Sequence, residues 1–80
     1  PDSAAPAPDE DVQRKRACAA LDVALRALPL RQQQAFLLRI WEELDVAQTA
    51  QAMGCSEGSV KTHLFRALQV LRQRLGDHWP

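Results

Sequence analysis

Apolar residues recur at three- and four-residue steps along most of the chain, which is the spacing of one face of an α-helix. The first stripe predicts a helix over about residues 9–27, ended by Pro29. A second pattern follows at once in "LRQQQAFLLRIWEEL", residues 30–44. The first stripe consists of Ala17, Cys18, Leu21, Ala24, Leu25 and Leu28, and the second helix is expected to bury Phe36, Leu37, Ile40, Trp41 and Leu44.

Two further helices are indicated by the residues that can begin and end them. Asp45 suits the N-cap of a short helix over residues 46–53, and Gly54 can close it in the left-handed conformation. Ser56 can cap a last helix over residues 57–75, which should end at the glycine that follows. The pattern therefore predicts an all-α fold, a four-helix bundle.

The third and fourth predicted helices have the layout of a helix-turn-helix: a short helix, a tight turn with glycine and a longer helix. Ala50 supplies a small side chain where the two helices cross, and Gly54 supplies the flexible turn. Val60 is then expected to pack back onto the short helix. Ala and Gly are also common in helical hairpins that do not bind DNA, so the spacing alone leaves that alternative open.

Phe65 does not join the apolar face of the last helix. At about 100° per residue it lies roughly 140° from Val60, on a polar face. Phenylalanine can contact a thymine methyl, and arginine can take guanine or a phosphate. A single exposed Phe can also pack on another domain, but its basic neighbours favour nucleic acid. The predicted base contacts are Lys61, Thr62, His63, Phe65 and Arg66.

Charge is balanced overall, with ten acids and ten bases in 80 residues. A net charge of zero gives no support to DNA binding by itself. The charges are sorted, however: residues 14–39 carry six bases and one acid, and residues 56–76 carry four bases and one acid. Acids gather at residues 2–11 and 42–45. Taken alone, the charge distribution favours ordinary solvated helix faces as its explanation.

The first twelve residues, "PDSAAPAPDEDV", are predicted to be a flexible acidic and Pro-rich linker. Residues 13–76 would then form the domain and residues 77–80 a tail. Because the chain begins with Pro rather than Met, we expect it to be a piece of a longer protein. Two cysteines among helix-forming residues fit a reducing cytosol, so the expected location is cytoplasmic. No apolar run approaches the roughly 18 residues of a membrane span.

No metal, cofactor or catalytic site is predicted. Cys18, Cys55, His63 and His78 match no zinc-finger spacing, and both cysteines occupy expected apolar positions. No nucleophile with a neighbouring base, carboxylate pair or phosphate-binding loop is visible, so we expect no enzyme.

Several short motifs together resemble a known family. They are Leu28-Pro29, Phe36-Leu37-Leu38-Arg39, "SEGSVK" at residues 56–61 and Arg66-Ala67. From about residue 20 to residue 75 the chain resembles region 4 of the extracytoplasmic-function sigma factors, the domain that reads the promoter −35 element. The resemblance implies base contacts from Lys61, Thr62, Phe65 and Arg66 and a phosphate contact from Arg39. The full set of predicted phosphate contacts is Arg39, Ser56, Ser59 and Arg72.

The resemblance also implies partners: promoter DNA, the β flap of the RNA polymerase core and an anti-sigma factor. The acidic linker then looks like the segment that joins region 2 to region 4. Three positions depart from the family pattern. Thr49 stands where Ile or Val is usual, Ala47-Gln48 where Glu pairs are usual, and residues 68–70 where the helix is often basic. The last departure leaves room for a partner protein on Leu68 or Val70.

Two alternatives remain. The LuxR-type output domain of response regulators carries a similar "Ser-x-x-Thr-Val-Lys-x-His" pattern, which His63 fits. It lacks the Arg-Ala pair, however, and its last helix usually ends sooner, so the sigma interpretation is favoured. The other alternative is a sigma-like module that serves mainly to dock another protein.

Overall fold

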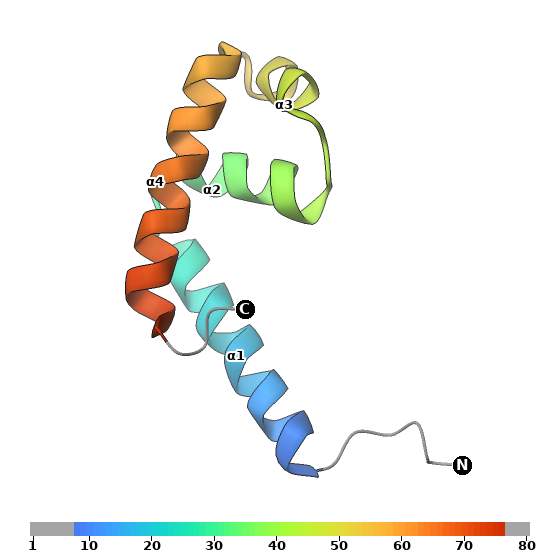
Figure 1. The fold of residues 1–80 in the computed structure, drawn as a ribbon, viewed down its shortest axis with the longest axis vertical. Coiled ribbons are helices and arrows are strands. Elements are labelled where there is room, and N and C mark those ends of the chain that lie inside the picture. The colour runs from blue at the N-terminus through green and yellow to red at the C-terminus, as the bar shows by residue number, and fades with distance from the viewer. Residues whose placement is uncertain (1–7, 77–80) are drawn as a thin grey trace, which may run out of the picture.

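The computed structural model describes residues 8–76, which form four α-helices and one π-helical turn. The elements are α1 (Pro8–Arg26), α2 (Leu30–Phe36), η2 (Leu37–Trp41), α3 (Val46–Met53) and α4 (Glu57–Leu75). The long helix α4 organises the others: α3 lies beside its first half, α1 lies toward its second half, and α2 lies between them (Figure 1). The all-α prediction is confirmed, and residues 8–76 contain no strand.

The ends of α3 and α4 lie where the sequence predicts them. Asp45 Oδ1 accepts from the Gln48 backbone N–H at 2.7 Å, and Gln48 Oε1 accepts from the Asp45 N–H at 3.0 Å. This reciprocal pair is a capping box. Gly54 closes α3 with φ of 68°. Ser56 Oγ accepts from the Ser59 N–H at 3.1 Å and caps α4.

Two departures from the family pattern have local explanations. Gln48, which stands where glutamate is usual, completes the capping box with its amide oxygen. Thr49, which stands where Ile or Val is usual, is fully buried. Its hydroxyl donates to the Asp45 carbonyl at 2.8 Å, so no polar group is left unpaired there.

The core forms two clusters along α4. The first joins α1, α2 and the second half of α4 through Ala24, Leu28, Phe36, Ala67, Leu71 and Leu75. The second joins α2, α3 and the start of α4 through Ala35, Ala50, Met53 and Val60. Leu64 is half-buried and packs against both clusters, which makes the core continuous. The predicted packing of Val60 with the short helix α3 is confirmed.

The prediction for the second helix is wrong in its length and in its buried face. The α-helix changes to a π-helical turn at Leu37 and ends at Trp41 instead of continuing to residue 44. The Glu42 N–H donates to the Leu37 carbonyl, five residues back, at 2.9 Å. A wider turn shifts the phase of the side chains that follow. Of the five side chains expected inside, Phe36 is buried and Leu44 half-buried, but Leu37, Ile40 and Trp41 are 37%, 48% and 69% exposed.

The prediction that Cys18 lies on the buried stripe of α1 is also wrong, because its side chain is exposed. On a helical wheel it lies about 120° from Ala24, at the edge of the buried stripe. Of the rest of that stripe, Ala24 and Leu28 are buried, and Ala17, Leu21 and Leu25 are half-buried. Cys55 is half-buried and packs against the second cluster, in keeping with its predicted apolar position.

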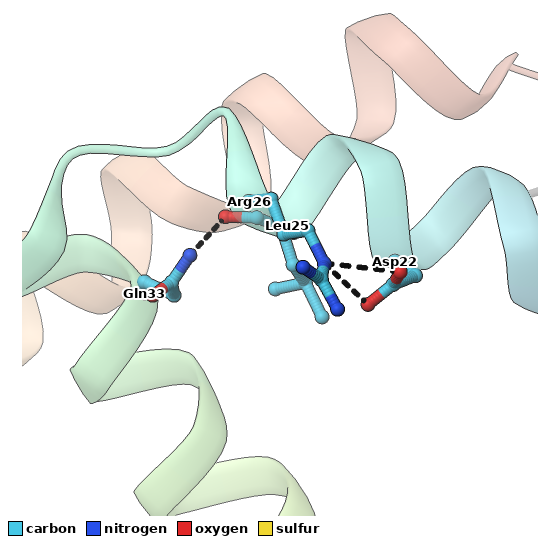
Figure 2. A network of polar contacts seen from close by, with 4 residues as sticks. All are labelled: Asp22, Leu25, Arg26 and Gln33. Carbon is cyan, nitrogen blue, oxygen red and sulfur yellow. Dashed lines mark hydrogen bonds and ion pairs between the residues drawn. The ribbon is translucent and has the colours of Figure 1, made fainter.

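The junction between α1 and α2 is held by Gln33. Its Nε2 donates to the Leu25 carbonyl at 2.6 Å (Figure 2). That carbonyl lies in the last turn of α1 and accepts from the Leu28 N–H at 3.1 Å, but the usual donor four residues on is replaced by Pro29, which has no N–H. Beside it, Arg26 Nε donates to the Asp22 carboxylate at 3.1 and 3.2 Å (Figure 2). This pair is exposed, so Gln33 contributes more to fixing the turn.

The predicted division into linker, domain and tail stays a prediction. Residues 8–12 belong to the first turns of α1. The remainder of the predicted linker, residues 1–7, and the tail, residues 77–80, lie outside the described residues. Within the described part, none of the helices has the length and apolar character needed to cross a membrane.

The loop between η2 and α3 contains a strained residue, Glu43, with φ of 58°. A side chain at positive φ costs about 1–2 kcal/mol. Glycine relieves this strain, but its greater freedom in the unfolded chain offsets part of the gain. We therefore expect Glu43→Gly to raise the free energy of unfolding by about 0.5–1 kcal/mol. Urea denaturation measures the change. Glu42→Gly removes the same charge at φ of −85° and serves as control, and equal effects of the two variants would contradict the strain.

Candidate nucleic-acid interface

Four of the five residues predicted to read bases form one exposed strip on α4. We call Lys61, Thr62, Phe65 and Arg66 the α4 strip; all four are exposed, and Phe65 is 62% exposed. The opposite side of the helix buries Val60, Ala67, Leu71 and Leu75. His63, the fifth residue, is half-buried at the border. The structure thus brings together the residue types that can contact base edges in a major groove.

Further along α4 the same face continues with Gln69 and Arg72, both exposed. At 1.5 Å per residue, Arg72 lies about 16 Å along the axis from Lys61. Gln69 was not among the predicted base contacts. Its helical position placed it on the polar face, and its amide can pair with adenine. Arg72 is far enough from the α4 strip to meet backbone phosphate rather than the same bases.

The N-terminus of α4 presents two hydroxyl groups. Ser56 Oγ accepts the capping bond and also donates to Ser59 Oγ at 3.1 Å. The Ser56 hydroxyl is therefore occupied within the protein. Ser59, which is half-buried, can still donate its own hydroxyl hydrogen outward. Of the two predicted phosphate contacts here, Ser59 has the side chain better suited to the role, and Ser56 acts mainly as the cap.

Arg39 does not lie on α4 but on η2, where it is half-buried. Its Nη1 donates to the Leu44 carbonyl at 2.6 Å. Its Nε is buried and has no hydrogen-bond partner among the described residues. The phosphate contact predicted for Arg39 stays a prediction, and the structure adds a bond to the protein backbone that the sequence did not indicate.

The cations of the strip are available to an outside partner. Among the side chains that the structure describes, the ion pairs lie on α1, between Lys15 and Asp11 at 3.4 Å and between Arg26 and Asp22 at 3.1 Å. No described carboxylate pairs with Lys61 or Arg66. An incoming anion therefore needs to break no ion pair with a described residue to reach them.

Of the residues considered for a zinc site, the three that the structure describes, Cys18, Cys55 and His63, form no metal-binding group. Across residues 8–76, no group of three His, Cys, Asp or Glu side chains is arranged to hold a metal ion. Cys18 is exposed on α1, and Cys55 lies in the turn before α4. His78 lies outside the described residues.

Comparison with known proteins identifies the family to which this fold belongs. The family model for sigma-70, region 4 matches residues 18–71. The chain belongs to this family. It is 40% identical over 70 residues to the ECF RNA polymerase sigma factor BldN of Streptomyces coelicolor, covering 88% of this chain and 26% of that protein. It is 41% identical over 70 residues to an RNA polymerase sigma-E factor of the same species, and the match covers 85% of this chain and 39% of that protein. It is 38% identical over 55 residues to RNA polymerase sigma factor SigV of Bacillus subtilis, and the match covers 69% of this chain and 33% of that protein.

Membership of sigma-70 region 4 confirms the recognition made from the motifs of the sequence. Region 4 is a DNA-binding transcription domain and not an enzyme. The match favours the sigma interpretation over the response-regulator alternative. The chain spans only 26–39% of the length of these three relatives. The functions of a complete sigma factor are therefore not established for this chain by the similarity alone.

Proposed function

We propose that this region 4 domain binds the −35 element of a promoter by placing α4 in the major groove. The observation that carries the proposal is the α4 strip: an exposed Phe65 flanked by Lys61 and Arg66, directly opposite the core. Single exposed apolar side chains are common on protein surfaces, but a phenylalanine flanked by two cations has the chemistry needed to contact DNA. A thymine methyl can pack on its ring, and the neighbouring cations suit guanine.

Each residue of the interface has a proposed role. Arg66 and Lys61 pair with base edges, Thr62 supplies a hydroxyl, and Phe65 packs on a thymine methyl. His63 touches the edge of the groove. The backbone N–H groups at the start of α4, together with Ser59 and Arg72, hold phosphates and so fix the orientation of the helix, while Ser56 caps it.

RNA polymerase is the second proposed partner, through the β flap of its core enzyme. The exposed apolar side chains on η2, namely Leu37, Ile40 and Trp41, provide a surface that does not belong to the α4 strip. A third proposed partner is an anti-sigma factor. Leu68 and Val70, which the sequence suggested for such a contact, are half-buried against the first cluster and so offer little surface. All these partners imply a cytoplasmic protein, and none implies a membrane.

The test is binding of this 80-residue chain to a randomised duplex library, followed by titration of the selected duplex. We expect selection of one motif at low salt but weak binding at physiological salt. The net charge is zero, and only a few cations reach phosphates. For one to three phosphate contacts the slope of log K against log salt should lie between about −1 and −3.

Tight promoter binding should need region 2 and the polymerase, which raise the effective concentration of this domain at its site. A scrambled version of the selected duplex is the control. No enriched motif would contradict −35 reading by the strip. Nanomolar affinity at physiological salt would contradict the dependence on the rest of the sigma factor.

A further inference from the structure

Both ends of α3 are tied by arginine side chains to the helical segment that precedes it. Arg31 on α2 donates from Nη1 to the carbonyl of Met53, the last residue of α3, at 2.9 Å. Arg39 on η2 donates from Nη1 to the carbonyl of Leu44, the residue before the N-cap of α3, at 2.6 Å. Both arginines are half-buried, which limits competition from water.

The Arg31 bond satisfies a carbonyl that the helix itself leaves open. The last carbonyls of a helix lack intrahelical donors, and a positive charge there also favours the helix dipole. The turn that follows α3 directs the N–H groups of Gly54 and Cys55 to earlier carbonyls, those of Ala50 and Gln51. The Met53 carbonyl receives Arg31 instead. Arg31 Nη1 also donates to Gln34 Oε1 at 3.2 Å, which fixes its orientation.

The Arg39 bond holds the other end through the loop. The backbone of Leu44 makes two hydrogen bonds: its N–H donates to the Leu38 carbonyl at 3.0 Å, and its carbonyl accepts from Arg39. The preceding Glu43 has a positive φ, a conformation that persists only where surrounding contacts impose it. The following Asp45 forms the capping box of α3. The Arg39 bond thus lies between a strained residue and a helix cap.

We propose that Arg31 and Arg39 are positioning residues that fix α3 on the α2–η2 segment and thereby set how α4 is presented to DNA. Ala50 and Met53 of α3 pack with Val60 of α4, so a displaced α3 removes the support beneath the first turns of the α4 strip. The effect on DNA rests on the proposed function, whereas the effect on α3 does not. For Arg39, this role takes the place of a phosphate contact.

The two roles of Arg39 predict different results for Arg39→Gln. A positioning role predicts that hydrogen exchange of the α3 amides in the DNA-free protein accelerates about tenfold or more, as expected for loss of a charge-assisted hydrogen bond. It also predicts a weaker preference for the selected duplex with an unchanged salt slope. A phosphate contact predicts unchanged α3 exchange and a slope smaller in magnitude by about 0.9, and that result would overturn the proposal.

Arg72→Gln is the matched control, since Arg72 is exposed and makes no side-chain hydrogen bond within the described residues. It should reduce the salt slope and leave α3 exchange unchanged. Arg31→Gln should accelerate hydrogen exchange most at the C-terminal turn of α3. Unchanged exchange there would overturn the positioning role of Arg31. If Arg39→Gln does not fold, Arg39→Lys keeps the charge, and faster α3 exchange in that variant supports positioning. Failure of the wild type to select any motif would contradict the proposed function and leave the exchange results standing.

Discussion

Leu71→Ala is expected to lower the free energy of unfolding of this domain by about 3–4 kcal/mol. Leu71 is fully buried on α4, in the cluster that joins it to Ala24 of α1 and Phe36 of α2. Truncating a buried leucine removes its transfer free energy and leaves a cavity, at a cost of about 2–5 kcal/mol. Domains of this length have only about 4–12 kcal/mol in total. The substitution should therefore remove a large share of the stability.

Urea denaturation followed by circular dichroism measures this loss. Leu30→Ala is the control, because Leu30 is 64% exposed and its truncation should change the free energy of unfolding by less than about 0.5 kcal/mol. Loss of DNA binding by Leu71→Ala would follow from unfolding and carries no separate information. If both variants are equally stable, the second half of α4 does not pack on α1 and α2 as described.

Arg66→Ala is expected to weaken binding to the selected duplex by about 1–3 kcal/mol and to relax preference at one base pair. Arg66 is exposed in the α4 strip, and no carboxylate of the described residues competes for it. A guanidinium can take the two acceptors of guanine in the major groove at once, and alanine cannot replace either bond. Because no core contact is lost, the stability of the domain should be unchanged.

Titrations against the selected duplex and against single-base variants separate base contacts from phosphate contacts. A base contact changes discrimination, whereas a phosphate contact weakens all sequences alike. Arg72→Ala is expected to show the second behaviour and serves as the control. Lys61→Ala shows which class Lys61 belongs to. Unchanged discrimination in both Arg66→Ala and Lys61→Ala would remove the α4 strip as the reading surface.

The sequence by itself determined the ends of α3 and α4 and the membership of the α4 strip, because both depend on local geometry. The bonds of Asp45 with Gln48 and of Ser56 with Ser59 join residues three positions apart, so side-chain type and spacing suffice to predict them. The same holds for the exposed face of α4. Its regular helix keeps about 100° per residue, and Phe65 therefore falls opposite the core as the periodicity predicts.

Only the tertiary structure decided the second helix and the surroundings of α3. Extrapolating the α-helical period beyond Phe36 buries Trp41, whereas the π-helical turn places it outside, and no residue type in this segment marks that change. Arg31 reaches a backbone carbonyl 22 positions away. Backbone carbonyls are the same at every residue, so the sequence carries no signal for such a partner. Which side chains hydrogen-bond to these carbonyls is decided by how α3 and α4 pack on α2.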